Sequence, residues 1–176
     1  SLALVGMRDV RDYLLASGGT GRRGAGSPFN VSAGSLTMRN FTAEEVGELY
    51  AQHKADTGQA FEEPAVARAF DLSQGQPWLV NALARECVEV LVRDRALPVA
   101  ATHIDQAKDA LVRRIDTHLD SLAERLREDR VRSVIEPIMA GVVGPNLPPD
   151  DVRYVLELGL VRPNPLGGLQ VANPIY

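Results

Sequence analysis

The chain has 176 residues, enough for one domain or two small ones with a buried core. Its net charge of −4 gives no overall electrostatic reason to expect nucleic acid or an anionic membrane as a partner. The single cysteine, Cys87, excludes an internal disulfide and a cluster of cysteine zinc ligands, and no apolar run is long enough to span a bilayer, so we expect a cytoplasmic protein.

The first residues predict a buried strand. Ser1–Gly6 is continuously apolar, which is typical of a strand in a sheet covered on both faces. Partner strands are not in the sequence, and the chain stops without a polar tail, so we expect a piece of a longer protein. Arg8 would lie at the carboxyl end of this strand, where open α/β sheets bind ligands, and is a candidate for phosphate binding. An ion pair with Asp9 or Asp12 is the alternative.

A glycine-rich stretch over 18–27 carries the letters of a dinucleotide-binding fingerprint in Gly19–Gly24. That fingerprint needs a strand before it and a helix directly after it, so that the pyrophosphate meets the helix N-terminus. Here a predicted helix precedes it and Ser27–Pro28 follows. The lysine of a Walker A loop is also missing, because Ala25–Gly26 stands in its place. We therefore predict a mobile surface loop, followed by short extended segments.

Two helices are predicted next from their start and stop signals. Thr42 is a good N-cap and Glu45 completes a capping box, so a helix begins there and ends near Gly58. Pro64 starts a second helix that ends before Ser73.

A third helix follows Gly75–Gln76–Pro77 and is predicted to run to about Arg93. Gly75 permits a tight turn, and Pro77 has the φ value that a first helical turn requires. The helix carries one apolar stripe at helical spacing: Leu79, Val80, Leu83, Ala84, Cys87, Val88 and Leu91. The plainer interpretation is a loop-to-helix junction with Trp78 in the core. Arg95–Val99 breaks the pattern and is our candidate for a domain boundary.

The last third predicts helices and then a hairpin. Thr102 is expected to cap a helix whose apolar stripe continues to Leu126 with a bend near Thr117, and a helix over 131–139 follows. A short helix opens at Pro148 and ends at Gly159. Its predicted inward residues are Val152, Val155 and Leu156. The stretch 160–171 has a turn at 164–168 between two apolar runs, which indicates a β-hairpin. Three helices followed by a hairpin is the order of a winged helix.

Four stretches together carry a resemblance to a known family. They are Leu2–Arg8, Leu36–Glu45, Gly75–Leu83, and the closing run Val155–Tyr176. In this order, the chain resembles the C-terminal half of prokaryotic P-loop ATPases of the AAA+/STAND group. The resemblance implies a mainly α fold: a remnant of an α/β P-loop core over 1–40, a helical lid domain over 41–98 and a winged-helix domain over 99–176.

The same resemblance implies which residues contact the nucleotide. Arg8 matches the sensor-one arginine, which reads the γ-phosphate in relatives. Pro77, within Gly75–Gln76–Pro77, matches the Gly-x-Pro motif of the lid, whose proline packs against adenine. A rigid apolar ring at a helix start suits that role, because it gives a flat surface without disturbing backbone hydrogen bonds. Trp78 is expected in the core, and a place in the wall of the pocket is the alternative.

The departures from the family limit the activity we expect. Neither the Walker A loop nor the acidic Walker B strand is present, and catalysis of phosphoryl transfer depends on those parts. We therefore expect a switch module that is not catalytic by itself. It would act with a missing N-terminal P-loop core, where ATP or ADP binds with Mg²⁺. A protein partner or self-association also fits, whereas DNA binding by the winged helix is not favoured. A pure protein–protein scaffold remains the other alternative.

Overall fold

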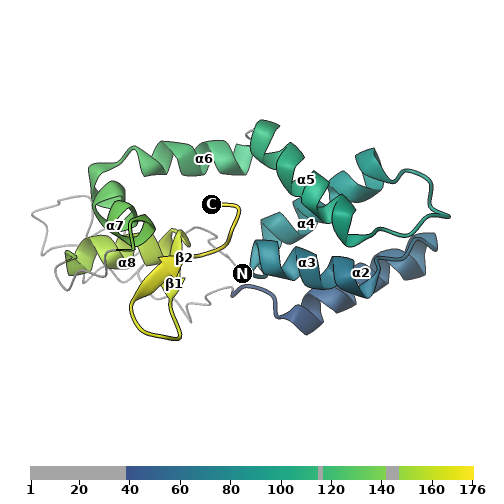
Figure 1. Ribbon diagram of the computed structural model, residues 1–176, viewed down its shortest axis with the longest axis horizontal. Helices are drawn as coiled ribbons and strands as arrows, with labels where there is room; N and C mark the ends of the chain where they lie inside the picture. The colour runs from purple at the N-terminus through teal and green to yellow at the C-terminus, as the bar shows by residue number, and fades with distance from the viewer. Residues whose placement is uncertain (1–38, 115–116, 142–146) are drawn as a thin grey trace, which may run out of the picture. The chain divides into compact units, whose positions relative to one another are not determined.

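The computed structural model describes residues 39–114, 117–141 and 147–176 (Figure 1). This part of the chain is mainly helical, as the sequence predicted, and has one antiparallel two-stranded sheet. Apart from Arg39, it belongs to one of the two units into which the chain divides, Asn40–Tyr176. The predicted N-terminal strand, Arg8 and the glycine-rich stretch lie outside the described residues.

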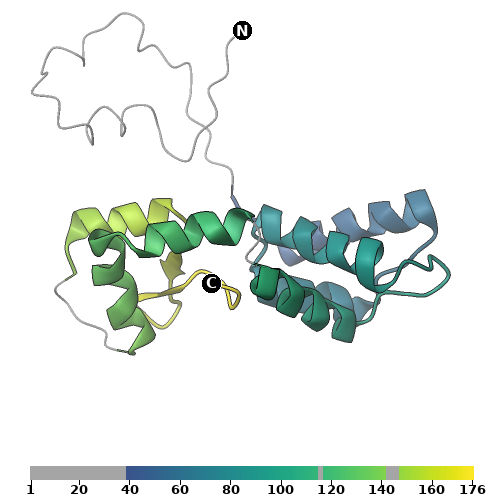
Figure 2. The ribbon, with the colours of Figure 1, turned by 90° about the horizontal axis from the view of Figure 1, so that it is seen from above.

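Four α-helices and a π-helical turn build what we call the first core (Figure 2). They are α2 (Ala43–Thr57), α3 (Glu63–Ser73), α4 (Pro77–Glu86), η1 (Cys87–Leu91) and α5 (Ala101–Arg114). Burial of an aliphatic side chain stabilises a fold by about 1.5–3 kcal/mol. The buried residues packed together here are Val46, Tyr50, Ala65, Ala69, Leu72, Val80, Leu83, Cys87, Val92, Val99, Ile104, Ala107 and Leu111.

The start and end of α2 follow the sequence signals. The Thr42 side chain accepts a hydrogen bond from the Glu45 amide, and the Glu45 carboxylate accepts one from the Thr42 amide at 2.8 Å. At the other end, Gly58 adopts a left-handed conformation with φ of 82° and its amide donates to the Lys54 carbonyl. Left-handed backbone at a helix end suits glycine, which has no Cβ to clash. Both predicted boundaries are confirmed.

The predicted stripe on the third helix is wrong in its last turn. After Glu86 the backbone changes to a π-helical turn, in which the Val92 amide donates to the Cys87 carbonyl five residues earlier. The wider turn rotates the residues that follow it around the helix axis. Val92 is therefore buried at 5% exposure, and Leu91, which the stripe placed inside, is 36% exposed.

The helix α5 corrects two further expectations. It begins at Ala101, so Thr102 is not its cap; instead, Nδ1 of His103 accepts a hydrogen bond from the Ala100 amide at 3.0 Å. Ile104, Ala107 and Leu111 of α5 belong to the first core. The expected boundary between residues 98 and 99 therefore falls inside one packed unit.

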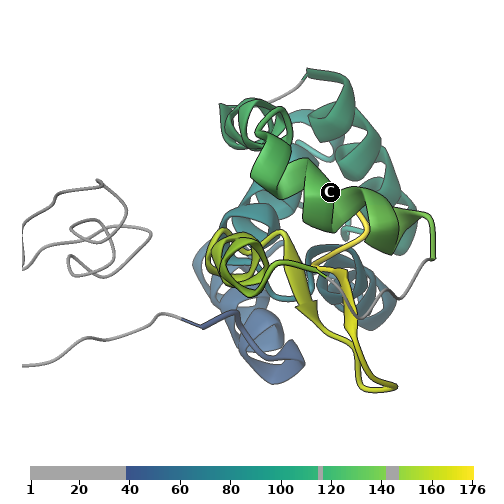
Figure 3. The same cartoon turned by 90° about the vertical axis from the view of Figure 1, so that its left-hand side faces the viewer.

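The remaining elements build the second core (Figure 3). They are α6 (Thr117–Leu126), α7 (Asp129–Met139), α8 (Pro149–Glu157), β1 (Val161–Pro163) and β2 (Leu169–Val171). The strands pair antiparallel, with Val161 opposite Val171, which confirms the predicted hairpin. The buried residues of the second core are Leu122, Val131, Val134, Ile135, Tyr154, Val155, Leu160 and Val161.

The inward face of α8 agrees with the predicted one except at one residue. Tyr154 and Val155 are buried, while Leu156 is 37% exposed. Val155 is therefore inward as predicted, and Val152 packs partly buried against the second core. Only Leu156 was wrongly placed, because the tyrosine two residues before it packs inward instead. Likewise, the stripe predicted as one bent helix belongs to two helices, because α5 ends at Arg114 and α6 begins at Thr117.

Candidate functional site

The turn between α3 and α4 carries the predicted site residues that the structure describes. Two successive residues here are left-handed, Gln74 with φ of 50° and Gly75 with φ of 73°. The Ser73 hydroxyl donates to the Ala69 carbonyl at 2.7 Å and accepts from the Gly75 amide at 3.1 Å. The Gln76 amide closes the turn by donating to the Ser73 carbonyl at 3.0 Å. The turn is thus held by its own hydrogen bonds.

Gly75 lies against the segment that enters α2. Its carbonyl accepts a hydrogen bond from the Phe41 amide at 2.8 Å. A Cβ atom placed on Gly75 would lie 1.9 Å from the Phe41 carbonyl oxygen, so only glycine fits there. Gly75 is buried, and its backbone faces Phe41 rather than open space.

Gln76 is the N-cap of α4. Its side-chain oxygen accepts a hydrogen bond from the Leu79 amide at 2.6 Å, which satisfies one of the free donors of the first turn. The side-chain oxygen of Gln76 therefore has a structural role that the motif alone did not predict.

Two predicted site residues of this turn, Pro77 and Trp78, have no capping role and are partly exposed. Both are half-buried, directly before the fully buried Leu79 and Val80. Pro77 occupies the first helical position, where its lack of an N–H costs no hydrogen bond. The structure therefore brings Gly75, Gln76, Pro77 and Trp78 together in one rigid turn. Arg8 lies outside the described residues.

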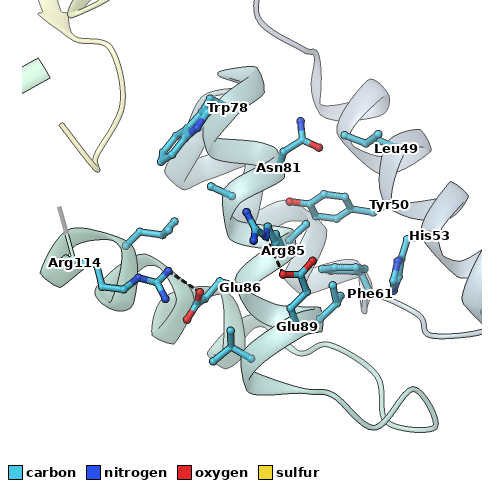
Figure 4. Close-up of a pocket in the computed structure, with 15 residues that line it drawn as sticks. Leu49, Tyr50, His53, Phe61, Trp78, Asn81, Arg85, Glu86, Glu89 and Arg114 are labelled. Carbon is cyan, nitrogen blue, oxygen red and sulfur yellow. Dashed lines mark hydrogen bonds and ion pairs between the residues drawn. The ribbon is translucent and has the colours of Figure 1, made fainter. Parts of the chain in front are cut away.

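An open groove of about 790 Å³ runs along α4, between α2 and α5 (Figure 4). Trp78 lies at one end of it, and Pro77 does not line it. Sequence reasoning missed this groove, because its wall combines residues from separate elements. The lining includes the side chains labelled in the figure: Leu49, Tyr50, His53, Phe61, Trp78, Asn81, Arg85, Glu86, Glu89 and Arg114.

Two ion pairs cross the groove wall in different surroundings. Glu86 is nearly buried, with 6% of its side chain exposed, and an oxygen of its carboxylate lies 2.7 Å from Nη2 of Arg114. Arg85 at the end of α4 and Glu89 in η1 pair at 2.8 Å, and both side chains are exposed (Figure 4). A buried carboxylate needs a partner far more than an exposed one does. The sequence signal for Glu86 was its place directly before Cys87 on the apolar stripe.

Burial decides the chemistry of the thiol in this region. It raises the pKa of Cys87 to about 12, and the neighbouring Glu86 charge acts in the same direction. A thiol with so high a pKa is protonated at neutral pH and is a poor nucleophile or metal ligand. The Tyr50 hydroxyl, whose pKa is raised by burial, donates to the Val80 carbonyl at 2.8 Å. Both groups therefore act as parts of the core.

A network of polar side chains fixes α8 in the second core. The Tyr154 hydroxyl donates to the Glu128 carboxylate at 2.9 Å, and burial together with this carboxylate raises the pKa of the tyrosine. The guanidinium carbon of Arg130 lies 3.8 Å from the centre of the Tyr154 ring, a cation–π contact. Nε of Arg130 lies 3.3 Å from a carboxylate oxygen of Asp151. Asp151 and Tyr154 thus both face Arg130.

Other kinds of site were sought over the same residues. Within the described ranges, no three His, Cys, Asp or Glu side chains converge to hold a metal ion. No helix of this part combines the length and apolar character needed to cross a bilayer. Comparison with models of known families and with curated proteins found no match to this chain.

Proposed function

We propose that the chain is the nucleotide-dependent switch module of a P-loop ATPase of AAA+/STAND type, acting as a lid over adenine and as a winged helix. The observation that carries this proposal is that Pro77 is only partly buried and stands on a turn whose backbone is held by Gly75 and Ser73. A rigid apolar ring held in this way offers adenine a flat surface at little cost in conformational entropy.

The two cores support the proposal that the module consists of a lid and a winged helix. The first core, including α5, would be the lid, so its end lies after Arg114 rather than at residue 98. The second core has three helices followed by a hairpin, which is the order of a winged helix. In this proposal the nucleotide biases the lid by contacts made in only one of two states, since only differential contacts can shift an equilibrium.

The missing P-loop core would supply the rest of the site. ATP or ADP with Mg²⁺ would bind to that core, and Arg8 would reach the γ-phosphate. In this chain, Pro77 would contact the adenine ring and Trp78 would extend the apolar wall beside it. The chain alone would then neither hydrolyse ATP nor bind it tightly.

The test compares two prolines at helix starts. In the longer protein that carries this chain behind a P-loop core, Pro77→Asp should weaken ATP binding by roughly tenfold or more, about 1.4 kcal/mol, because a hydrated carboxylate would replace the stacking ring. Pro64→Asp is the matched control, since Pro64 is exposed in the first turn of α3. Aspartate is favourable in a first helical turn, so both variants should fold.

Isothermal titration with ATP and Mg²⁺ measures both variants. A thermal shift of the longer protein by the same ligand gives a second readout, because a ligand that binds the native state raises its apparent stability. Equal ATP affinities for Pro77→Asp, Pro64→Asp and the parent protein would exclude the lid role of Pro77.

A further inference from the structure

We propose that Gly75 is a positioning residue: it joins the segment entering α2 to the turn that carries Pro77, so that this segment sets the orientation of Pro77. This inference rests on the proposed function for the role of Pro77, but the mechanical link itself does not. Gly75 would then not touch the nucleotide.

Two hydrogen bonds tie the entering segment to the turn. The Phe41 amide donates to the Gly75 carbonyl at 2.8 Å, and Nδ2 of Asn40 donates to the Gln74 carbonyl at 3.1 Å. These bonds join positions far apart in the sequence, as the separation of 34 residues between Asn40 and Gln74 shows. Phe41 also packs its side chain against the first core. The segment is therefore anchored through both its backbone and its side chain.

The contact is too close to tolerate any side chain at residue 75. A Cβ there would lie 1.9 Å from the Phe41 carbonyl oxygen and 2.9 Å from the Phe41 carbonyl carbon. Both are backbone atoms, which cannot rotate away as a flexible side chain can. Glycine is needed at this position for the close approach as well as for its φ of 73°.

The link from Gly75 to Pro77 is short and stiff. Only Gln76 intervenes, and two hydrogen bonds hold it. Its backbone amide donates to the Ser73 carbonyl, and its side-chain oxygen accepts from the Leu79 amide. Few backbone dihedrals are left to absorb a displacement of the segment. A movement of residues 40–41 would therefore move the first turn of α4 rather than be lost in a loose loop.

Two glycine variants distinguish the effect of this link from the effect of backbone strain alone. Gly75→Ala introduces both the strain of positive φ and the clash with Phe41. Gly58→Ala introduces the same kind of strain, at φ of 82°, but its added Cβ meets nothing within 4 Å. We expect the Phe41 amide to exchange its hydrogen at least about tenfold faster in Gly75→Ala, and at the parent rate in Gly58→Ala.

The environment of Trp78 provides the second readout on the whole chain. Trp78 is the only tryptophan of the sequence and follows Pro77 directly. Its emission and its quenching by acrylamide should change in Gly75→Ala and not in Gly58→Ala. Asn40→Ala is a milder variant that removes the bond to the Gln74 carbonyl and adds no clash, and it should also raise the quenching of Trp78. It keeps the inference testable if Gly75→Ala does not fold.

The outcomes separate the link from the nucleotide role. Parent-like Phe41 exchange in Gly75→Ala, or unchanged Trp78 quenching in both Gly75→Ala and Asn40→Ala, would overturn the link even if Pro77→Asp weakens ATP binding. If exchange and quenching change as expected while Pro77→Asp binds ATP as the parent does, the link stands and the nucleotide proposal fails. If both hold, Gly75→Ala should also lower ATP affinity in the longer protein.

Discussion

Glu86 and Arg114 form an ion pair in which one partner is nearly buried and the other is half exposed, with 6% and 48% of their side chains accessible. The pair joins α4 to the last turn of α5 at 2.7 Å. It therefore ties the helix that begins at Pro77 to the helix that completes the first core.

We expect Arg114→Ala to lower the free energy of unfolding by about 2 kcal/mol, because it leaves the Glu86 carboxylate without this partner in a nearly buried position. Arg85→Ala is the matched control. It removes an exposed pair with Glu89 one helical turn away and should cost no more than about 0.5 kcal/mol. Urea denaturation measures both. The double variant Glu86→Gln with Arg114→Ala should recover part of the loss, and equal stabilities of the two single variants would contradict the prediction.

A second pair of variants tests the helix starts. Thr42→Ala removes the hydroxyl that caps α2 and should lower the free energy of unfolding by about 1 kcal/mol. Thr102→Ala should change it by less than about 0.5 kcal/mol, because α5 already begins at Ala101 and Thr102 is exposed inside it. Thermal or urea unfolding distinguishes them. A larger loss for Thr102→Ala than for Thr42→Ala would restore the cap predicted from the sequence.

Structural features that depend only on residues close together in the chain were predictable from the sequence. The capping box of Thr42 and Glu45, the glycine that ends α2 and the hairpin that follows Leu160 all depend on neighbours in the chain. The Gly75–Gln76–Pro77 motif likewise gave the start of α4 correctly. These are local choices of backbone conformation, for which the necessary information lies in the segment itself.

Features that depend on distant partners were not predictable. The π-helical turn moved Val92 inward in place of Leu91, and nothing in the residue spacing indicates an added residue in a turn. Gln59 is buried because its Nε2 donates to the carbonyls of Val92 and Leu97 at 2.8 and 3.1 Å. Sequence alone suggests a surface position for such a residue. Gly75 was predicted as part of a ligand motif, but its contact with Phe41 became apparent only in three dimensions.

The lowered pKa of Glu128 leads us to expect a loss of stability in acid. Burial alone would raise its pKa, but hydrogen bonds from Arg125 and Tyr154 outweigh burial and hold the pKa below the usual 4.5. A carboxyl with a lower pKa in the folded state stabilises the fold at higher pH, and this contribution is lost as the pH falls below 4.5 through the folded-state pKa.

We therefore expect the melting temperature of the parent to fall more steeply between about pH 5 and pH 3 than that of Glu128→Gln. Glu136→Gln is the control, because Glu136 pairs with Arg132 on the exposed side of α7 and should leave the slope unchanged. Thermal unfolding followed by circular dichroism across this range measures the slopes. Parallel curves for the parent and Glu128→Gln would contradict the assigned role of Glu128.

The face of α8 leads to a prediction about DNA. In a winged helix that binds DNA, this helix would enter the major groove. The helix α8 carries three acidic residues and one arginine: Asp150, Asp151, Glu157 and Arg153. Two of its side chains, Asp151 and Tyr154, face Arg130. An acidic helix is repelled by phosphates, and its one arginine cannot offset that repulsion. We expect no binding of the 176-residue chain to a duplex of about 20 base pairs at about 50 mM salt in fluorescence anisotropy. Binding that falls steeply with salt and weakens in Arg153→Ala would instead assign α8 to DNA recognition.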